Sequence, residues 1–172
     1  LVDQMTPQVA YNFMVNNLGF TTLVESREQN GQTYSDIDIA PLSMGGLTDG
    51  VSTLEMTAAY ATFPNGGTYY EPMTYYYILD SENEMVLDNQ SVGTTAMKES
   101  TAYYMNVLLR NVVTSGTGSS AYLNNMPVAG KTGTADKNND RWFVGYTPYY
   151  VAAVWTGYDT PEAMNISGNP AI

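Results

Sequence analysis

A lysine stands between glycines and small hydroxyl-bearing residues in the stretch Gly130-Lys131-Thr132-Gly133-Thr134. The chain has 172 residues, a net charge of −11 and only six basic side chains against 17 acids, so Lys131 is a rare cation here. An ammonium and hydroxyls can hold a carboxylate, and a strand backbone N–H can polarise a carbonyl. The stretch predicts a binding or catalytic strand, the open alternative being a buried strand with an incidental surface lysine.

The side chains that are missing narrow the chemistry further. These 172 residues contain no His and no Cys, which excludes a Ser-His-Asp triad, a His general base, thiol catalysis and metals held by His or Cys. Acid–base chemistry must then use Lys, Tyr or carboxylates, and we expect no metal and no cofactor. Without a basic stripe, nucleic acid and anionic membrane surfaces are also disfavoured as partners.

One alternative for the lysine stretch is a phosphate-binding P-loop, because Gly130-Lys131-Thr132 matches the end of that motif. The motif also requires a glycine five positions before Gly130, where Asn125 stands. It further requires a helix after the Lys-Thr pair, whereas the residues downstream, such as Val144 and Val151, are typical of strands. Nucleotide binding is therefore rejected.

The C-terminal part of the chain predicts three strands that would position this stretch. Residues 127–135, 141–147 and 150–157 are strand-like and are separated by the short polar turn 136–140 and by Pro148-Tyr149. Short connections between consecutive strands favour an antiparallel meander. With the helices expected upstream, the fold class is α+β, with an antiparallel sheet packed against helices.

Strand alternation has a direct consequence for the site. It places Lys131 and Gly133 on one face of the strand and Thr132 and Thr134 on the other. A site that uses all four must lie at the edge of the strand, where an extended peptide can also dock as an added strand. Gly133 would let another element approach closely.

Three helices are expected before the meander. Thr6-Pro7 is an N-cap followed by a proline at the first helical position, and Gly19 ends that helix. Ser52-Thr53-Leu54-Glu55 is a capping box that opens a second helix. The longest helix is expected at 98–114. Its apolar stripe is expected at Tyr104, Leu108 and Val112, with Met105 and Leu109 beside it.

The remaining segments predict turns and strands. Residues 20–38 are polar and contain the turn signal Asn30-Gly31, so we expect a loop with at most a short strand. Residues 68–79 are rich in Tyr and predict a strand that forms a hairpin with Met85-Val86-Leu87. Residues 91–96 are expected to be a linker.

Four sequence blocks occur in a definite order: GLTDGVSTLEM at 46–56, NGGTYYEP at 65–72, VAGKTGT at 128–134 and RWFVGYTP at 141–148. In this order they resemble the penicillin-binding transpeptidase domain of class A penicillin-binding proteins. The resemblance runs from near Thr6 to about Asp159, which is nearly the whole chain. It implies an incomplete domain with the fold of serine β-lactamases and transpeptidases.

The resemblance also implies an activity and roles for individual residues. The family are D,D-transpeptidases that cross-link peptidoglycan stem peptides and are acylated by β-lactams, and their signatures include S-x-x-K, S-x-N and K-T-G. Lys131 would be catalytic, supporting the protonation network of the serine. Thr132, Gly133 and Thr134 would bind substrate, the two hydroxyls holding its carboxylate and the Thr134 N–H forming half of the oxyanion hole. Trp142 and Tyr146 would serve packing.

The chain departs from the family pattern at the nucleophile. The residues three positions before its lysines are Thr95, Val128 and Thr134, so no Ser-x-x-Lys is present. Two matches to S-x-N, at Ser81-Glu82-Asn83 and Ser167-Gly168-Asn169, are interpreted as coincidences. The first lies in a hairpin turn, and the second follows Lys-Thr-Gly, which the family's copy precedes.

We therefore expect residues 1–172 to be a single partial domain, the C-terminal portion of a transpeptidase domain that is inactive alone. The alternative is a non-catalytic binding or structural module on the same scaffold. In the parent, the partners would be stem peptides, β-lactams and the missing N-terminal part of the domain.

The parent would be anchored in the membrane and would work on its extracytoplasmic face. The chain itself is expected to be soluble, because no run approaches the length of a membrane span. An exposed sheet edge at 150–157 and a bare sheet face would favour self-association.

Overall fold

The computed structural model combines helices with antiparallel strands and describes residues 2–172 apart from the side chain of Val2. This composition confirms the α+β fold class predicted from the sequence. The helices are α1 (Val2–Met5), α2 (Pro7–Leu18), α3 (Ile39–Met44), α4 (Thr53–Ala61) and α5 (Glu99–Ser115), with single 3-10 turns η1 (Ser119–Ala121) and η2 (Asp136–Asn138). The strands are β1 (Arg27–Gln29), β2 (Gln32–Tyr34), β3 (Thr68–Tyr69), β4 (Tyr77–Leu79), β5 (Met85–Asp88), β6 (Thr94–Thr95), β7 (Ala129–Thr134), β8 (Asp140–Tyr146) and β9 (Val151–Gly157).

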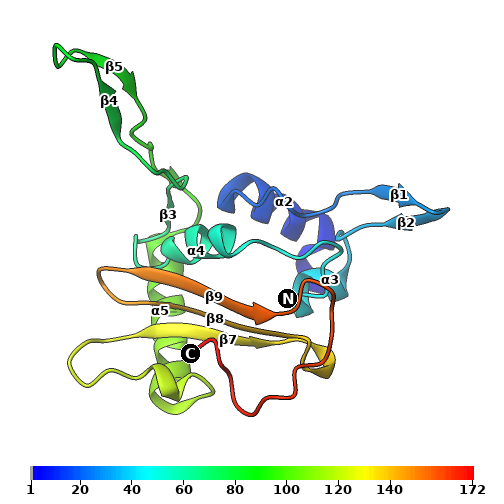
Figure 1. The fold of residues 1–172 in the computed structure, drawn as a ribbon. Helices are drawn as coiled ribbons and strands as arrows, with labels where there is room; N and C mark the ends of the chain where they lie inside the picture. Colours follow the sequence, from blue (N-terminus) through cyan, green and yellow to red (C-terminus); the bar gives the residue numbers. More distant parts are fainter. Residues whose placement is uncertain (1) are drawn as a thin grey trace.

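The predicted meander is confirmed as the sheet β7-β8-β9, which is antiparallel throughout. Its register places Lys131 opposite Val144, and Val144 opposite Ala153. In Figure 1, α5 crosses behind the three strands and α4 lies along β9. Strands β7 and β9 are the two outer strands of this sheet, so each has one edge without a strand partner among the described residues.

Helix α5 packs on the sheet through Leu109 and Met105, which were predicted to lie beside the apolar stripe, and not through the centre of that stripe. Its buried side chains are Ala102, Leu109 and Val113, whereas Tyr104 and Leu108 of the predicted stripe are 67% and 59% exposed. Leu109 packs in one cluster with Ala129 and Tyr146 of the sheet. Val113 packs in a second cluster, with Phe143 of β8. Two neighbouring stripes of this helix both repeat with the helical period, so periodicity alone did not distinguish them.

A polar residue in the packed region of α5 links three elements. The Asn106 side chain donates from Nδ2 to the carbonyl of Phe63, just after α4, at 2.9 Å. The Tyr146 hydroxyl of β8 donates to Asn106 Oδ1 at 2.6 Å. Burial, and to a smaller extent the nearby Tyr60, raises the pKa of Tyr146 well above its usual range. The phenol is thereby kept as a neutral hydrogen-bond donor to the helix.

The chain after β9 returns across the sheet. The Met164 N–H donates to the Asn138 carbonyl at 3.1 Å, and Asn169 Nδ2 donates to the Trp142 carbonyl at 3.0 Å. Ala171 is buried in one cluster with Val113 and Phe143. The C-terminal segment therefore packs against the sheet at a place where α5 also contacts it.

A buried carboxylate organises the loops around the N-terminal helices. Asp36 has no exposed surface, and its Oδ2 accepts a hydrogen bond from the Val24 N–H at 2.8 Å. Its Oδ1 accepts from both the N–H and the hydroxyl of Thr48, each at 2.7 Å. One side chain therefore joins three segments that are distant in sequence, and this satisfies a carboxylate that would be costly to bury unpaired.

The strand predictions between the helices were correct only in part. Asn30-Gly31, with φ values of 53° and 75°, forms the turn of the β1–β2 hairpin. The strand expected at 68–79 is divided into β3 and β4, and only β4 pairs with β5 in the predicted hairpin. Strand β3 pairs instead with β6, which lies in the segment expected to be a linker. Two-residue strands such as β6 leave almost no pattern in a sequence.

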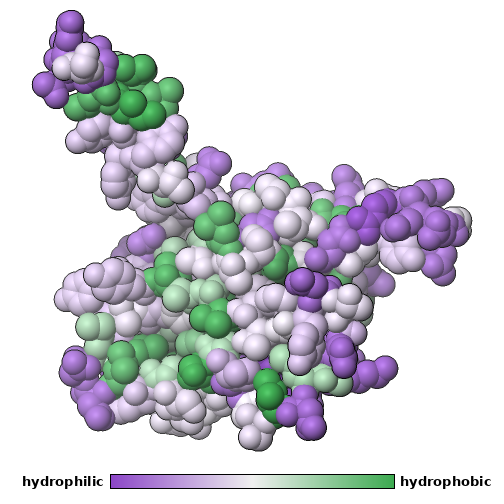
Figure 2. Space-filling model, viewed as in Figure 1, coloured by the Kyte–Doolittle hydropathy of each residue, from purple (hydrophilic) through white to green (hydrophobic). Residues whose placement is uncertain are grey.

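The β4–β5 hairpin projects from the body of the protein (Figure 1). All its strand residues are exposed although most are apolar, among them Tyr77, Ile78 and Val86. Figure 2 shows this apolar surface below a hydrophilic tip. Among the described residues, no helix is long and apolar enough to cross a membrane.

The predicted capping box of α4 is present, and its glutamate also fixes the segment after α2. Glu55 accepts hydrogen bonds from the backbone N–H groups of Thr21, Thr22 and Ser52 at 2.7, 3.1 and 2.9 Å. The hydroxyls of the same three residues also bond to it. Partial burial of Glu55 raises its pKa, but the hydrogen bonds from Ser52, Thr21 and Thr22 together outweigh burial and lower that pKa to about 2.

Replacement of Glu55 by Gln should lower the free energy of unfolding at pH 7. The full pKa difference corresponds to about 3 kcal/mol, and because the side chain is partly exposed we expect about 1–2 kcal/mol. Since the folded pKa lies below the value of 4.5 for a free carboxyl, the wild type should lose this stability as pH falls from about 4.5 to about 2. The Glu55→Gln variant should not show that loss in urea unfolding at pH 7 and pH 3. Glu82→Gln in the exposed hairpin turn is the control, and an identical pH dependence for Glu55→Gln and wild type would refute the assignment.

Candidate substrate-binding strand

The four predicted site residues all lie on β7, an outer strand of the sheet. After β7, the Ala135 N–H donates to the Asp140 carbonyl at 3.0 Å, so this residue directs its backbone toward β8. Backbone groups alternate sides along an antiparallel strand. Thr132 and Thr134 therefore direct their N–H and C=O groups to the open edge, and Gly133 directs its own toward β8.

Lys131 is exposed and bends toward this open edge. Its ammonium donates to the carbonyl of Thr132 at 2.7 Å. The bond agrees with an outward-facing Thr132 carbonyl, because a carbonyl in the β7–β8 ladder would be engaged by β8. The positive charge therefore lies beside backbone groups that an extended ligand would reach.

Thr132 has a hydroxyl partner that the sequence did not reveal. Its Oγ1 lies 2.7 Å from Oγ1 of Thr117, which is in the turn after α5. Gly116 approaches Val112 so closely that a Cβ on Gly116 would lie 2.9 Å from the Val112 carbonyl oxygen. This tight turn at the end of α5 brings Thr117 to β7. In the sequence, the only indication of this turn is the pair of glycines on either side of Thr117.

Thr134 is contacted by a basic side chain from the neighbouring strand. Arg141 is its direct cross-strand partner, and Arg141 Nη1 donates to Thr134 Oγ1 at 2.9 Å. Arg141 Nη2 donates to Asn138 Oδ1 at 3.0 Å. A second cation is thus held against the predicted site. Sequence reasoning assigned no role to Arg141, because its approach to Thr134 depends on the register between β7 and β8.

Two glycines allow β7 to pack beneath an aromatic ring. Gly130 and Gly145 are cross-strand partners on the same face as Phe143. A Cβ on Gly145 would lie 2.5 Å from Phe143 Cε1, and a Cβ on Gly130 would lie 2.8 Å from Phe143 Cζ. The ring therefore occupies the space above both glycines. Gly133 lies on the other face, where its Cβ would lie 3.0 Å from Trp142 Cβ.

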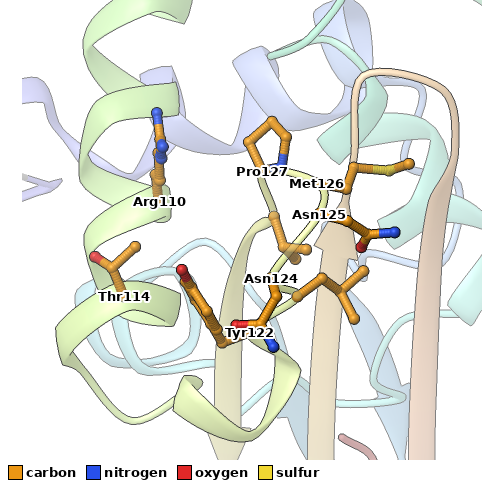
Figure 3. A pocket seen from close by; sticks show the side chains of 9 residues that line it. Arg110, Thr114, Tyr122, Asn124, Asn125, Met126 and Pro127 are labelled. Atoms are coloured by element: carbon orange, nitrogen blue, oxygen red, sulfur yellow. The ribbon is translucent and has the colours of Figure 1, made fainter.

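One of the two S-x-N matches lies far from these four residues in the fold, whereas the other contacts Trp142, the cross-strand partner of Gly133. Ser81-Glu82-Asn83 is at the tip of the β4–β5 hairpin, and Asn169 of the second S-x-N match is bonded to the backbone of Trp142 and Ala171. An open hollow of about 290 Å³ lies between α5 and the segment before β7. Figure 3 shows Arg110 and Tyr122 among its lining residues. Within residues 2–172, no cluster of acidic side chains has the arrangement of a metal site.

The chain belongs to the penicillin-binding protein transpeptidase family. The family model described as penicillin binding protein transpeptidase domain matches residues 2–168. Penicillin-binding protein 1A of Clostridium acetobutylicum is 40% identical over 158 residues, which are 90% of this chain and 19% of that protein. Penicillin-binding protein 4 of Bacillus subtilis is 37% identical over 164 residues, which are 95% of this chain and 24% of that protein. The predicted class A penicillin-binding transpeptidase domain is thereby confirmed, and the chain spans about a fifth to a quarter of these relatives.

Solved structures show the same fold. The D,D-transpeptidase domain of a peptidoglycan glycosyltransferase from Eggerthella lenta matches with a TM-score of 0.64 and 22% identity, over 89% of this chain and 43% of that one. The PonA1 protein of Mycobacterium tuberculosis in complex with penicillin V matches with a TM-score of 0.69 and 20% identity, over 91% and 41%. The predicted transpeptidase-like α+β fold is confirmed by these matches.

Replacement of Gly145 by Ala should destabilise the protein, because the new methyl group would overlap the ring of Phe143. Overpacking of this kind costs about 1–3 kcal/mol, measured as the change in the free energy of unfolding in urea. Gly46→Ala is the matched control, since Gly46 has no positive φ and no atom within 4 Å of its added Cβ. Equal stabilities of the two variants would show that the Phe143 ring does not constrain this position.

Proposed function

We propose that this chain forms one side of the active site of a serine D,D-transpeptidase, which cross-links peptidoglycan stem peptides and is acylated by β-lactams. The observation that carries the proposal is the open edge of β7, with the ammonium of Lys131 and the hydroxyls of Thr132 and Thr134 beside it. This arrangement occurs in a chain whose family is that of penicillin-binding transpeptidases.

Each group has a proposed role in acyl transfer. A stem peptide lies along β7 as an added strand and bonds to its outward-facing backbone groups. The hydroxyls of Thr132 and Thr134 hold the terminal carboxylate, and Gly133, on the other face of the strand, lets another element approach closely. The Thr134 N–H supplies half of the oxyanion hole. Lys131 supports proton transfer at the nucleophile.

The nucleophile is proposed to come from outside these residues, because no Ser-x-x-Lys is present in the sequence. The chain covers 41% of penicillin-binding protein A of Mycobacterium tuberculosis, which was solved as an imipenem acyl-enzyme complex. We propose that residues 1–172 are the C-terminal portion of one such domain. The parent is proposed to work at the extracytoplasmic face of the membrane, where its substrate is.

A labelled penicillin tests the assignment of the nucleophile. This chain, incubated with fluorescent penicillin and then denatured, should carry no covalent label, because it has no serine in the family's motif. The longer parent protein is the positive control and should be labelled once per molecule. Stoichiometric labelling of the 172-residue chain would show that a nucleophile lies within it. A parent that lacks Ser-x-x-Lys and remains unlabelled would support the alternative, a non-catalytic module.

We also propose self-association through the outer edge of β9. Its Val154 and Trp155 are 42% and 37% exposed, and no strand of the described residues pairs with that edge. An unpaired edge with apolar side chains favours pairing with a second copy.

Light scattering at high concentration should therefore show a dimer, and Val154→Lys should shift it toward monomer. Val92→Lys, at an exposed valine outside this sheet, should leave the dimer unchanged. A wild-type chain that stays monomeric would rule out this association.

A further inference from the structure

We propose that Arg141 and Thr117 are positioning residues that make the hydroxyls of Thr132 and Thr134 a pair of donors for a ligand carboxylate. The inference rests on the proposed function of β7 and adds to it two residues from outside the Lys-Thr-Gly motif. Each contacts a site hydroxyl from another segment, Arg141 from β8 and Thr117 from the turn after α5.

The contact between Arg141 and Thr134 fixes the direction of one hydroxyl proton. A guanidinium has donors only, so Arg141 Nη1 must donate to Thr134 Oγ1, at 2.9 Å. Thr134 Oγ1 accepts this bond, and its own proton remains available to donate elsewhere. An anionic oxygen is the acceptor that such a hydroxyl binds most strongly.

The contact between Thr117 and Thr132 has the same consequence. Their hydroxyl oxygens lie 2.7 Å apart, and either can donate to the other. When a carboxylate arrives at β7, the favoured arrangement is donation from Thr117 to Thr132, because Thr132 can then donate to the anion. The hydrogen bond from Thr117 to Thr132 then polarises the Thr132 hydroxyl, and this strengthens the hydrogen bond from Thr132 to the ligand.

The two hydroxyls are placed to act on one ligand. Thr132 and Thr134 are two residues apart on a strand, so they lie on the same face with a spacing of about 7 Å. A carboxylate between them receives one hydroxyl on each oxygen. The ammonium of Lys131 is bonded to the Thr132 carbonyl at the strand edge, and its positive charge also attracts the carboxylate.

The charge of Arg141 is available to such a ligand. The one salt bridge among the described residues joins Arg27 to Asp49, so Arg141 is not neutralised by a carboxylate there. The neighbouring Asp140 is bonded to the indole N–H of Trp155 at 2.8 Å. An unneutralised guanidinium against a hydroxyl of the open strand is notable in a chain with a net charge of −11.

The position of Arg141 also lowers the stability of the folded state, which a purely structural side chain would not do. Its Nε is buried without a hydrogen-bond partner among the described residues. An unpaired buried donor destabilises the folded state. Its two Nη atoms donate hydrogen bonds to Thr134 and Asn138. The guanidinium is therefore held in one orientation, as a group that positions another must be.

Binding of N-acetyl-D-alanyl-D-alanine and of its C-terminal amide to the ¹⁵N-labelled 172-residue chain tests the inference. NMR titration gives both dissociation constants, and the ratio between the two ligands isolates recognition of the carboxylate. We expect wild type to bind the acid about tenfold more tightly than the amide. Arg141→Ala should reduce that preference to about twofold without changing the affinity for the amide. Thr117→Val should reduce it about threefold, and Thr117→Ser should restore it.

Arg110→Ala is the control for net charge, because it removes the same charge beside the separate hollow of Figure 3. It should keep the wild-type preference. Well-dispersed amide spectra establish that each variant is folded, and Arg141→Lys, which keeps the charge but loses the two-pronged contact, replaces Arg141→Ala if the latter unfolds. A wild-type preference that both Arg141 variants and Thr117→Val retain would overturn this inference alone. A wild type that does not prefer the acid would overturn the proposed function of β7 as well.

Discussion

The close contact between the Phe143 ring and the two glycines beneath it is the constraint on which the sheet depends. Gly130 and Gly145 face each other across β7 and β8, and neither can carry a side chain while the ring lies above them. Val113 of α5 and Ala171 of the C-terminal segment pack in the same cluster as Phe143. Helix, sheet and C-terminal segment are therefore held together at one point. The glycine before Lys131 thus serves packing, directly beside the residues that are proposed to face a ligand.

The two edges of β7 differ because of this constraint. Its inner edge is fixed to β8 in a register of six residue pairs, and the network of Asn106, Tyr146 and Phe63 holds β8 and α4 to α5. Its outer edge has no strand partner among the described residues. A strand that is rigid on one side presents its free N–H and C=O groups at fixed spacing on the other. An oxyanion hole requires this arrangement, because its donors stabilise developing charge only when they are already in place.

The parts of the structure that could be predicted from the sequence are those in which short-range chemistry decides. The N-cap at Thr6, the capping box of Glu55 and the Asn30-Gly31 turn each depend on a few adjacent residues. The buried face of α5 and the β3–β6 pair depend on distant packing, which local patterns do not contain. The site divides in the same way, because Lys131 to Thr134 stand in one motif, whereas Thr117 and Arg141 reach it through a tight turn and a strand register.

The division between motif and supporting residues has a chemical meaning. A Lys-Thr-Gly strand on its own supplies polar groups of the right kinds, but a free hydroxyl rotates and can either donate or accept. Arg141 removes that freedom from Thr134, since a guanidinium cannot accept a hydrogen bond. In the proposed function, recognition of a carboxylate is therefore a property of the folded sheet, and the elements to which it is assigned, α5, β7 and β8, all lie within this chain. The proposed acyl transfer requires in addition a nucleophile from outside these residues, so the proposal assigns carboxylate binding to this chain and divides it from the chemical step.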